Sequence, residues 1–283
     1  MTLPSYQQNT ERTDDMENRK FLTDAFLSLG IGLEDRQAEA FFRYYELLAE
    51  KNRVMNLTAI TEYKEVVIKH FADSAILFSP LFLKKLSELG ISAQPSLIDV
   101  GTGAGFPGLP LAIVNPSAKV YLLDALQKRV DFLEEVTVTL DLPNVFAAHG
   151  RAEEGVGFNL PEIFAALEKP AKNIPGAGSA VLRESFDLAV SRAVSDLSVL
   201  SEYCLPYVRV GGVFASYKSA DSDDEIRRAE RAIEILGGEI SEAVDFTLPE
   251  THDPRRIVLI RKVSETPGKY PRKSGKPAKS PLK

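Results

Sequence analysis

Residues 96–108 read Ser-Leu-Ile-Asp-Val-Gly-Thr-Gly-Ala-Gly-Phe-Pro-Gly, a short apolar run that leads into a turn with four glycines. The run 97–100 predicts a buried strand, and the apolar segment 109–113 behind the turn predicts the start of a helix. Glycine adopts backbone conformations that other residues avoid, and it lets a ligand approach the main chain closely. A strand, a glycine turn and a helix N-terminus in this order predict a nucleotide-type cofactor site.

From residue 96 onward, short apolar runs alternate with helical patterns. This alternation predicts an α/β fold with a doubly wound, mostly parallel sheet of seven strands. The last two predicted strands have only a short polar link between them, so we expect them to pair as an antiparallel hairpin at one edge. The seven predicted strands are 97–100, 120–124, 145–149, 186–191, 213–217, 240–246 and 257–261. The predicted helices between them are 109–114, 128–140, 194–207 and 223–236.

The sheet is flanked by segments of different composition. Residues 1–15 are polar and predicted to be disordered, and 16–95 form a helical segment packed on a core that spans 96–262. Within it, helices are predicted at 16–29, 35–51 and 62–78. Frequent Gly and Pro at about 155–185 predict an insertion on the surface. Residues 263–283 are predicted to be a flexible basic tail.

Charge is unevenly distributed along the 283 residues. The net charge is −6, but Arg261 to Lys283 contains eight Lys or Arg and one acid, so this segment carries +7 and the remainder −13. A basic tail on an acidic body suggests contact with a polyanion, and the alternative is a solvated terminus without a partner. The single cysteine, Cys204, cannot form an internal disulfide, and we expect it to be a small core residue. No secretion signal or membrane-spanning run is visible, which predicts a cytoplasmic protein.

The residues in and around the turn bear on which of two adenosine cofactors, NAD or S-adenosylmethionine, binds there. Gly103 to Gly108 matches the dinucleotide pattern G-x-G-x-x-G, but the turn already begins at Gly101, and in that register the third glycine falls on Phe106. Asp99 is poorly matched to a pyrophosphate and suits a ligand with an ammonium and a sulfonium. Asp124 ends the second strand, where an acid accepts hydrogen bonds from ribose hydroxyls of either NAD or S-adenosylmethionine.

Several ordered blocks carry a resemblance to a known family. They resemble the bacterial small-subunit rRNA methyltransferase G family, also called the glucose-inhibited division protein B family. The blocks are residues 98–113, 52–58, 69–74, 122–130 and 186–193, Lys218 and the tail 269–282. The resemblance covers about 35–283 apart from the insertion. It implies a Rossmann-like class I methyltransferase fold with an N-terminal helical extension. It also implies methyl transfer from S-adenosylmethionine to N7 of a guanine in 16S rRNA, near the decoding centre.

The resemblance also implies a set of cofactor contacts. They are Gly101, Phe106, Asp124, Ala125, Leu126, Ala152, Glu153 and Arg192. Glu153 would hold the adenine amine. Arg192 follows the fourth strand and would bind the methionine carboxylate, or a phosphate or base edge of the RNA; the alternative is an ion pair with Asp187 or Asp196.

Guanine N7 has a lone pair and no proton, so the reaction implied by the resemblance needs no catalytic base. We therefore assign no catalytic residue, with Arg192 as the one candidate, and expect catalysis by positioning. His70 and Asp73 share a helix face, and we expect a local contact that positions the helix rather than acid–base chemistry. Asn56, Lys69 and His70 are candidates for the mouth of the site, and no metal-ligand spacing is present.

The expected partner is 16S rRNA or the small ribosomal subunit, bound by a monomer without a membrane. Basic residues outside the tail are candidate RNA contacts: Lys51, Arg53, Lys128, Arg129, Lys218, Arg255 and Arg256. Two other functions remain open at this point. One is an NAD-dependent oxidoreductase, and the other is a non-catalytic cofactor- or RNA-binding protein of the same fold.

Overall fold

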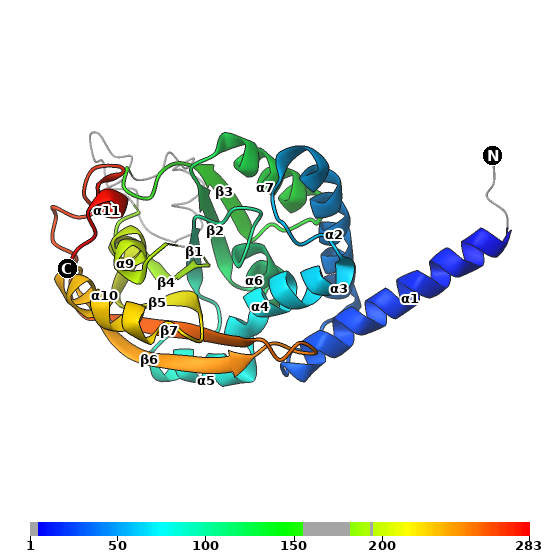
Figure 1. Ribbon diagram of the computed structural model, residues 1–283, viewed down its shortest axis with the longest axis horizontal. Coiled ribbons are helices and arrows are strands. Elements are labelled where there is room, and N and C mark those ends of the chain that lie inside the picture. Colours follow the sequence, from blue (N-terminus) through cyan, green and yellow to red (C-terminus); the bar gives the residue numbers. More distant parts are fainter. Residues whose placement is uncertain (1–4, 155–181, 193–194) are drawn as a thin grey trace.

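A computed structural model describes residues 5–154, 182–192 and 195–283 (Figure 1). Its centre is a seven-stranded sheet in the order β3-β2-β1-β4-β5-β7-β6. The strands are β1 (Ser96–Val100), β2 (Lys119–Asp124), β3 (Val145–His149), β4 (Phe186–Ser191), β5 (Val208–Ser219), β6 (Gly238–Thr247) and β7 (Pro254–Lys262). The first five strands pair in parallel, and β7 runs antiparallel between β5 and β6. The seven predicted strands and the antiparallel pair at the edge are confirmed.

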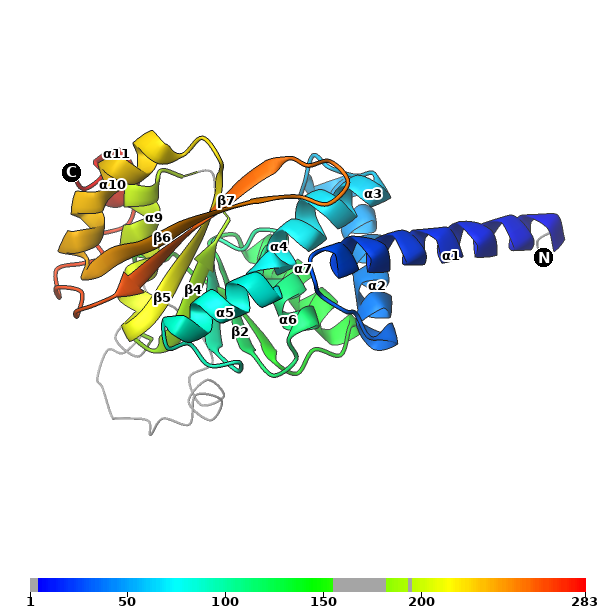
Figure 2. The same cartoon turned by 90° about the horizontal axis from the view of Figure 1, so that it is seen from below.

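Both faces of the sheet are buried by helices, as alternating side chains of one strand show. Leu97 belongs to an apolar cluster with the N-terminal helices and α6, whereas its neighbour Ile98 belongs to a second cluster with α9 and α10. Figure 2 shows α4 and α5 crossing the sheet on the side of α6, away from α9 and α10. The helices of the core are α6 (Gly108–Val114), α7 (Gln127–Thr139), α9 (Leu197–Cys204) and α10 (Asp223–Ile235). Cys204 is buried in the second cluster, as predicted.

The N-terminal region is helical, and all three predicted helices are present. Its elements are α1 (Ser5–Ser28), α2 (Asp35–Met55), α3 (Tyr63–Val66), a π-helical turn (Val67–Ala72), α4 (Asp73–Ala75), a 3-10 turn (Ile76–Phe78) and α5 (Pro80–Glu88). Helix α5 was not predicted, since Ser79-Pro80 reads as the end of the preceding helix. Proline is instead well suited to the first turn of a new helix, where its missing N–H has no partner to lose.

The prediction of a disordered segment over 1–15 is wrong for residues 5–15, because α1 begins at Ser5. The segment from Ser5 to Ser28 contains neither Gly nor Pro, so nothing in it interrupts a helix. Its other end is anchored by the buried side chains of Leu22, Ala25 and Phe26. The helix therefore extends outward from the body of the molecule (Figure 1).

The prediction of a flexible tail over 263–283 is also wrong. Tyr270 and Pro277 are buried, and Lys276–Lys279 forms the short helix α11. Arg272 forms an ion pair of 2.6 Å with Glu202, whose side chain is fully buried. Apolar residues between the lysines and a buried carboxylate that needs a cation hold the segment against the body. The insertion predicted at about 155–185 lies outside the described residues, except for 182–185.

One stretch of helix, Tyr63–Glu88, is long and apolar enough to cross a membrane, contrary to the expectation that no such run exists. Of its most apolar window, 72% is buried inside the protein. Phe71, Ala75 and Leu77 within it are fully buried in the cluster beneath the sheet. Its apolar character therefore belongs to the core.

Candidate active site

A cavity of about 320 Å³ lies at the carboxyl ends of β1, β2 and β3. We call it the β1–β3 cavity. Four of the eight predicted cofactor residues line it: Gly101, Ala125, Ala152 and Glu153. The remaining lining residues are Val100, Leu123, Gly150, Arg151, Ser195, Leu200, Tyr203, Gly275 and Ala278. The carboxyl ends of parallel strands are the usual place for a ligand in such a sheet, so the location agrees with the prediction from the glycine turn.

The glycines of the turn serve two purposes. A Cβ on Gly105 would lie 2.6 Å from the hydroxyl of Tyr44, and one on Gly108 would lie 2.3 Å from Leu122 Cδ2, so these positions need glycine for packing. Gly101 differs, because no atom lies within 4 Å of the place that its Cβ would take. Its φ of +77° also favours glycine. The backbone at Gly101 is therefore open to the cavity, as close approach by a cofactor requires.

Asp124 holds the turn together from the end of β2. Its carboxylate accepts hydrogen bonds of 2.9 Å from the backbone N–H of Gly103 and from that of Leu126. Arg129 lies 3.3 Å from the same carboxylate. Asp124 is buried and does not line the β1–β3 cavity, so in this structure its contacts fix the start of α7 and the glycine turn. The predicted contact with a ribose stays a prediction.

Phe106 and Leu126 also lie outside the lining of this cavity. The Phe106 ring is buried and stacks on the imidazole of His70, with 4.6 Å between ring centroids. The guanidinium of Arg192 lies 5.1 Å from the centroid of the same ring. Phe106 therefore supports Arg192 and His70, while Leu126 is 45% exposed.

Asp99 does not face a ligand. It is fully buried beneath the turn, and its Oδ2 accepts a hydrogen bond of 2.8 Å from the backbone N–H of Gly108. Burial raises the pKa of the Asp99 carboxyl to about 7. The expectation that Asp99 pairs with an ammonium or sulfonium is therefore wrong for this structure, because the turn itself covers the carboxyl group.

The raised pKa makes Asp99 a source of pH-dependent stability. Between about pH 4 and 7 the folded chain holds a proton that the unfolded chain releases, so the free energy of unfolding falls by about 1.4 kcal/mol per pH unit as pH rises. Asp99→Asn keeps an acceptor for Gly108 and lacks this slope. Between about pH 5.5 and 7.5, the free energy of unfolding measured in urea should fall by about 2 kcal/mol more for wild type than for Asp99→Asn. Equal losses would contradict this account.

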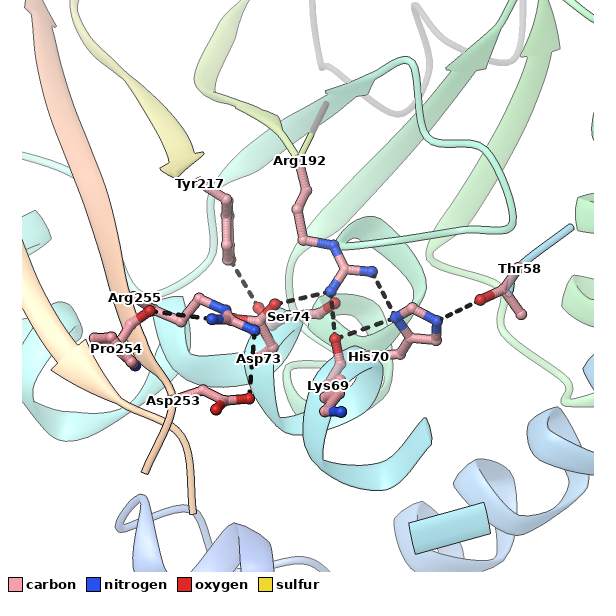
Figure 3. A network of polar contacts seen from close by, with 10 residues as sticks. All are labelled: Thr58, Lys69, His70, Asp73, Ser74, Arg192, Tyr217, Asp253, Pro254 and Arg255. Carbon is pink, nitrogen blue, oxygen red and sulfur yellow. Dashed lines mark hydrogen bonds and ion pairs between the residues drawn. The ribbon is translucent and has the colours of Figure 1, made fainter. Parts of the chain in front are cut away.

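Arg192 is held by a network that joins β4 to the N-terminal helices (Figure 3). One guanidinium nitrogen donates to the Lys69 carbonyl at 2.9 Å and to Asp73 Oδ2 at 3.0 Å. The other donates to Nδ1 of His70 at 3.1 Å. The predicted alternative of an ion pair with Asp187 or Asp196 is wrong, because those acids pair with Arg209 and Arg228 instead.

The π-helical turn explains why a backbone carbonyl is available to Arg192. The N–H of Asp73 bonds to the carbonyls of Ile68 and His70 and passes over that of Lys69. Lys69 O accepts from Arg192 instead. Such turns are frequent at functional sites because they redirect a few groups of a helix.

His70 is a neutral hydrogen-bonding group in this network. Burial, together with the nearby guanidinium of Arg192, lowers the pKa of its imidazole to about 3. Nδ1 lies 3.1 Å from the Arg192 guanidinium and 3.1 Å from the Lys69 carbonyl; in the tautomer in which Nδ1 accepts from Arg192, Nε2–H donates to Thr58 Oγ1 at 2.7 Å. His70 and Asp73 each contact Arg192, which follows β4, so the helix is linked to the sheet through Arg192 and not through the local contact that was expected. Neither Asn56, Lys69 nor His70 lines either of the two cavities described here.

A second cavity of about 570 Å³ lies beside the first, and we call it the β4–β7 cavity. It is bounded by the ends of β4 and β5, the start of β7 and helix α10. Ser195 lines both cavities, so the two share this residue as part of their walls. Its walls carry the cations Arg192, Lys218, Arg228, Arg255 and Arg256 and the acids Asp73, Asp196 and Glu225. Three predicted RNA contacts, Lys218, Arg255 and Arg256, are therefore brought together here.

The predicted basic contacts Lys51 and Arg129 form ion pairs with Glu135 and Asp124 on the surface of the core. Neither lines the two cavities, and the same holds for Arg53 and Lys128. Tyr203, Gly275 and Ala278, by contrast, line the β1–β3 cavity and were not predicted. No local pattern marks them, because they reach the cavity only through the packing of α9 and the C-terminal segment.

The C-terminal segment forms one wall of the β1–β3 cavity. The backbone N–H of Gly275 donates to Glu153 Oε1 at 2.9 Å, and Arg272 donates to both carboxylate oxygens of Glu202. Arg183 donates to the Tyr270 carbonyl at 2.7 Å. Glu153, predicted to hold an adenine, thus also fixes the segment that closes this side of the cavity.

Arg272→Met should loosen this wall. The change leaves the Glu202 carboxylate buried without its cation, so residues 266–283 should detach and the affinity for the cofactor expected in the β1–β3 cavity should fall about tenfold. Calorimetric titration measures the affinity, and hydrogen exchange of 266–283 measures the detachment. Unchanged exchange together with unchanged affinity would show that the ion pair does not hold the wall.

The sheet order and the site together define a class of protein. A sheet of order β3-β2-β1-β4-β5-β7-β6 with antiparallel β7, and a cavity at the glycine turn after β1, is that of the class I S-adenosylmethionine-dependent methyltransferases. A family model described as rRNA small subunit methyltransferase G matches residues 37–252. The chain belongs to this family and is an enzyme that uses S-adenosylmethionine.

Similar proteins cover almost the whole chain. The ribosomal RNA small subunit methyltransferase G of Lachnoclostridium phytofermentans is 45% identical over 267 residues, which are 94% of this chain and 98% of the relative. That of Acetivibrio thermocellus is 44% identical over 269 residues, 95% of this chain and 98% of the relative. That of Ligilactobacillus salivarius is 45% identical over 253 residues, with coverages of 89% and 94%. The NAD-dependent alternative is not favoured.

Proposed function

We propose that this enzyme transfers a methyl group from S-adenosylmethionine to N7 of a guanine in 16S rRNA, in the decoding region of the small ribosomal subunit. The observation that carries the proposal is that two cavities share Ser195 in their walls, one beside the glycine turn and one lined by cations. A methyl donor in the first and a nucleotide of RNA in the second would meet beside this shared residue. The names of the relatives supply the class of RNA.

The residues of the β1–β3 cavity fit the adenosine part of the cofactor. The open backbone at Gly101 and the small side chains of Ala125 and Ala152 leave room for it. Glu153 uses Oε1 for Gly275, and its second oxygen is suited to the adenine amine. Arg192 lines the neighbouring cavity and would hold the methionine carboxylate.

When bound, S-adenosylmethionine supplies an electrophilic methyl carbon. Guanine N7 attacks with an in-plane lone pair and releases no proton, so the protein has only to align the base and exclude water. The neutral state of His70 agrees with this, because an imidazole whose pKa is about 3 and whose Nδ1 accepts from Arg192 is not a proton acceptor at neutral pH. Its task is to position Arg192.

Cations around both cavities would hold the RNA backbone. Lys273, Lys276 and Lys279 are exposed on the packed C-terminal segment beside the β1–β3 cavity, and Arg228 is exposed at the rim of the other. Contacts of this kind bind phosphates without reading sequence, and binding should weaken as salt is raised.

The enzyme acts as a monomer in the cytoplasm.

The experiment uses labelled S-adenosylmethionine with 16S rRNA and, separately, with small ribosomal subunits. The expected product is one guanine that becomes sensitive to strand scission directed at 7-methylguanine. Label at another atom or base would reject the proposal. Cofactor or RNA binding without transfer would favour a non-catalytic binding protein, and saturable binding of NADH would favour the oxidoreductase.

A further inference from the structure

A buried ammonium group lies in the β4–β7 cavity beside Ser195, the residue that lines both cavities. Lys218 Nζ donates to the carbonyl of Ser195 at 2.8 Å and to Glu225 Oε1 at 2.6 Å. Only 7% of the Lys218 side chain is exposed, although the residue lines the β4–β7 cavity. An ammonium has three N–H donors, and these two acceptors use two of them. Among the residues that the structure describes, these are its two acceptors, so the third N–H is left for a ligand.

We infer that Lys218 donates this third hydrogen bond to O6 of the target guanine and so selects guanine for methylation; the inference rests on the proposed function. Guanine has the acceptor O6 beside N7, whereas adenine has an amino donor at that place. The ammonium therefore pairs with guanine and opposes adenine. A bond to O6 also leaves the N7 lone pair free for the methyl carbon.

Glu225 makes this ammonium compatible with the reaction. As the bond from N7 to the methyl carbon forms, the bond from carbon to sulfur breaks and its electron pair stays on sulfur. The positive charge thus moves onto the base, and no proton leaves. An unpaired ammonium beside the base would oppose that charge, but Glu225 pairs with Lys218 at 2.6 Å. Glu225 is itself fixed by the backbone N–H of Leu197 at 2.6 Å.

Two other cations of the cavity are less suited to this task. Arg256 donates to both carboxylate oxygens of Asp245 and to Asp223, so it joins β6, β7 and α10. Arg228 is 64% exposed and lies at the rim, which suits a phosphate. Lys218 combines burial, a fixed position and a free donor.

The test combines a substitution in the protein with a change of the target base and compares the single and the combined losses of activity. Wild type and Lys218→Met are assayed on small subunits or rRNA that carry either guanine or 2-aminopurine at the mapped position, since 2-aminopurine keeps N7 and lacks O6. We expect Lys218→Met to lower kcat/KM on guanine roughly 10- to 100-fold, with the Kd of S-adenosylmethionine changed less than about twofold. Wild type should lose a similar factor on 2-aminopurine, and the variant should lose nothing more. Lys84→Met, which removes an exposed lysine of α5, is the matched control and should change neither value.

Three outcomes would overturn the inference. The first is equal kcat/KM of wild type on guanine and 2-aminopurine. The second is a loss of kcat/KM by Lys218→Met on 2-aminopurine that equals the product of the two single losses. The third is a Lys218→Met variant with unchanged kcat/KM on guanine. The wild-type comparison of the two bases needs no variant, so it decides even where Lys218→Met does not fold. Absence of N7 methylation by wild type on guanine would instead reject the proposed function.

Discussion

Gly101→Val is expected to reduce the affinity for S-adenosylmethionine at least about 100-fold, equivalent to about 2.7 kcal/mol. The place of the Gly101 Cβ is empty and Gly101 lines the β1–β3 cavity, so we expect a side chain there to occupy space that the cofactor needs. The φ of +77° adds strain of about 1–2 kcal/mol to the folded state. Calorimetric titration measures the affinity, and urea unfolding measures the strain.

Gly90→Val separates these two effects. Gly90 has a φ of +85° and, like Gly101, no atom within 4 Å of its Cβ position, but it follows α5 and lines neither cavity. This control should lose similar stability and keep its cofactor affinity. An equal loss of affinity in both variants would mean that strain, and not occupation of the cavity, is responsible.

Lys262→Met is expected to cost about 3–5 kcal/mol of folding stability. Lys262 is fully buried on β7, and its ammonium donates to Glu184 Oε1 at 2.8 Å and to the carbonyls of Leu205 and Val208 at 2.9 and 3.1 Å. Burial lowers the pKa of this ammonium, and the bond to Glu184 opposes the change. Removing it leaves two carbonyls without this donor and the Glu184 carboxylate without its cation, with only the backbone N–H of Thr266, among the described residues, still donating to Oε1 at 2.7 Å; the loss is measurable as a lower urea midpoint.

A second substitution shows whether the Glu184 carboxylate, left without its cation, causes the loss of folding stability. Adding Glu184→Gln to Lys262→Met removes the unpaired carboxylate and should recover about 1–2 kcal/mol. Lys84→Met, on the exposed face of α5, should change stability by less than about 0.5 kcal/mol. A Lys262→Met protein as stable as the Lys84→Met control would show that the three contacts contribute nothing.

The sheet and the glycine turn could be predicted because their signals are local. Each strand is a short apolar run, and the turn after β1 is marked by four closely spaced glycines. The antiparallel edge pair followed from the short polar link between β6 and β7. The resemblance to the family supplied Gly101, Ala125, Ala152 and Glu153 as cofactor contacts, and all four line the cavity, each closely following the end of a predicted strand.

Other parts of the site depend on contacts between distant residues, which no local pattern contains. Arg192 meets Asp73 across 119 positions, and Gly275 meets Glu153 across 122. The tail looks disordered in sequence because its lysines dominate, and the buried Glu202 that binds Arg272 lies 70 positions away. Asp99 was misassigned because its burial under the turn depends on how Gly105 and Gly108 pack. Its pKa and that of His70 follow from burial, which only the folded structure gives.

The network around Arg192 shows how closely the sheet depends on the N-terminal helices. The arginine comes from the sheet, but its acceptors Lys69 O, Asp73 and His70 Nδ1 all come from the helical extension. The two regions also share one apolar cluster, in which Phe71 and Phe106 are neighbours. A sheet separated from its extension would keep a complete Rossmann-like topology, yet its arginine would have lost every one of these acceptors. The cofactor-binding half of this enzyme is thus not a self-sufficient part that could be transplanted without its helices.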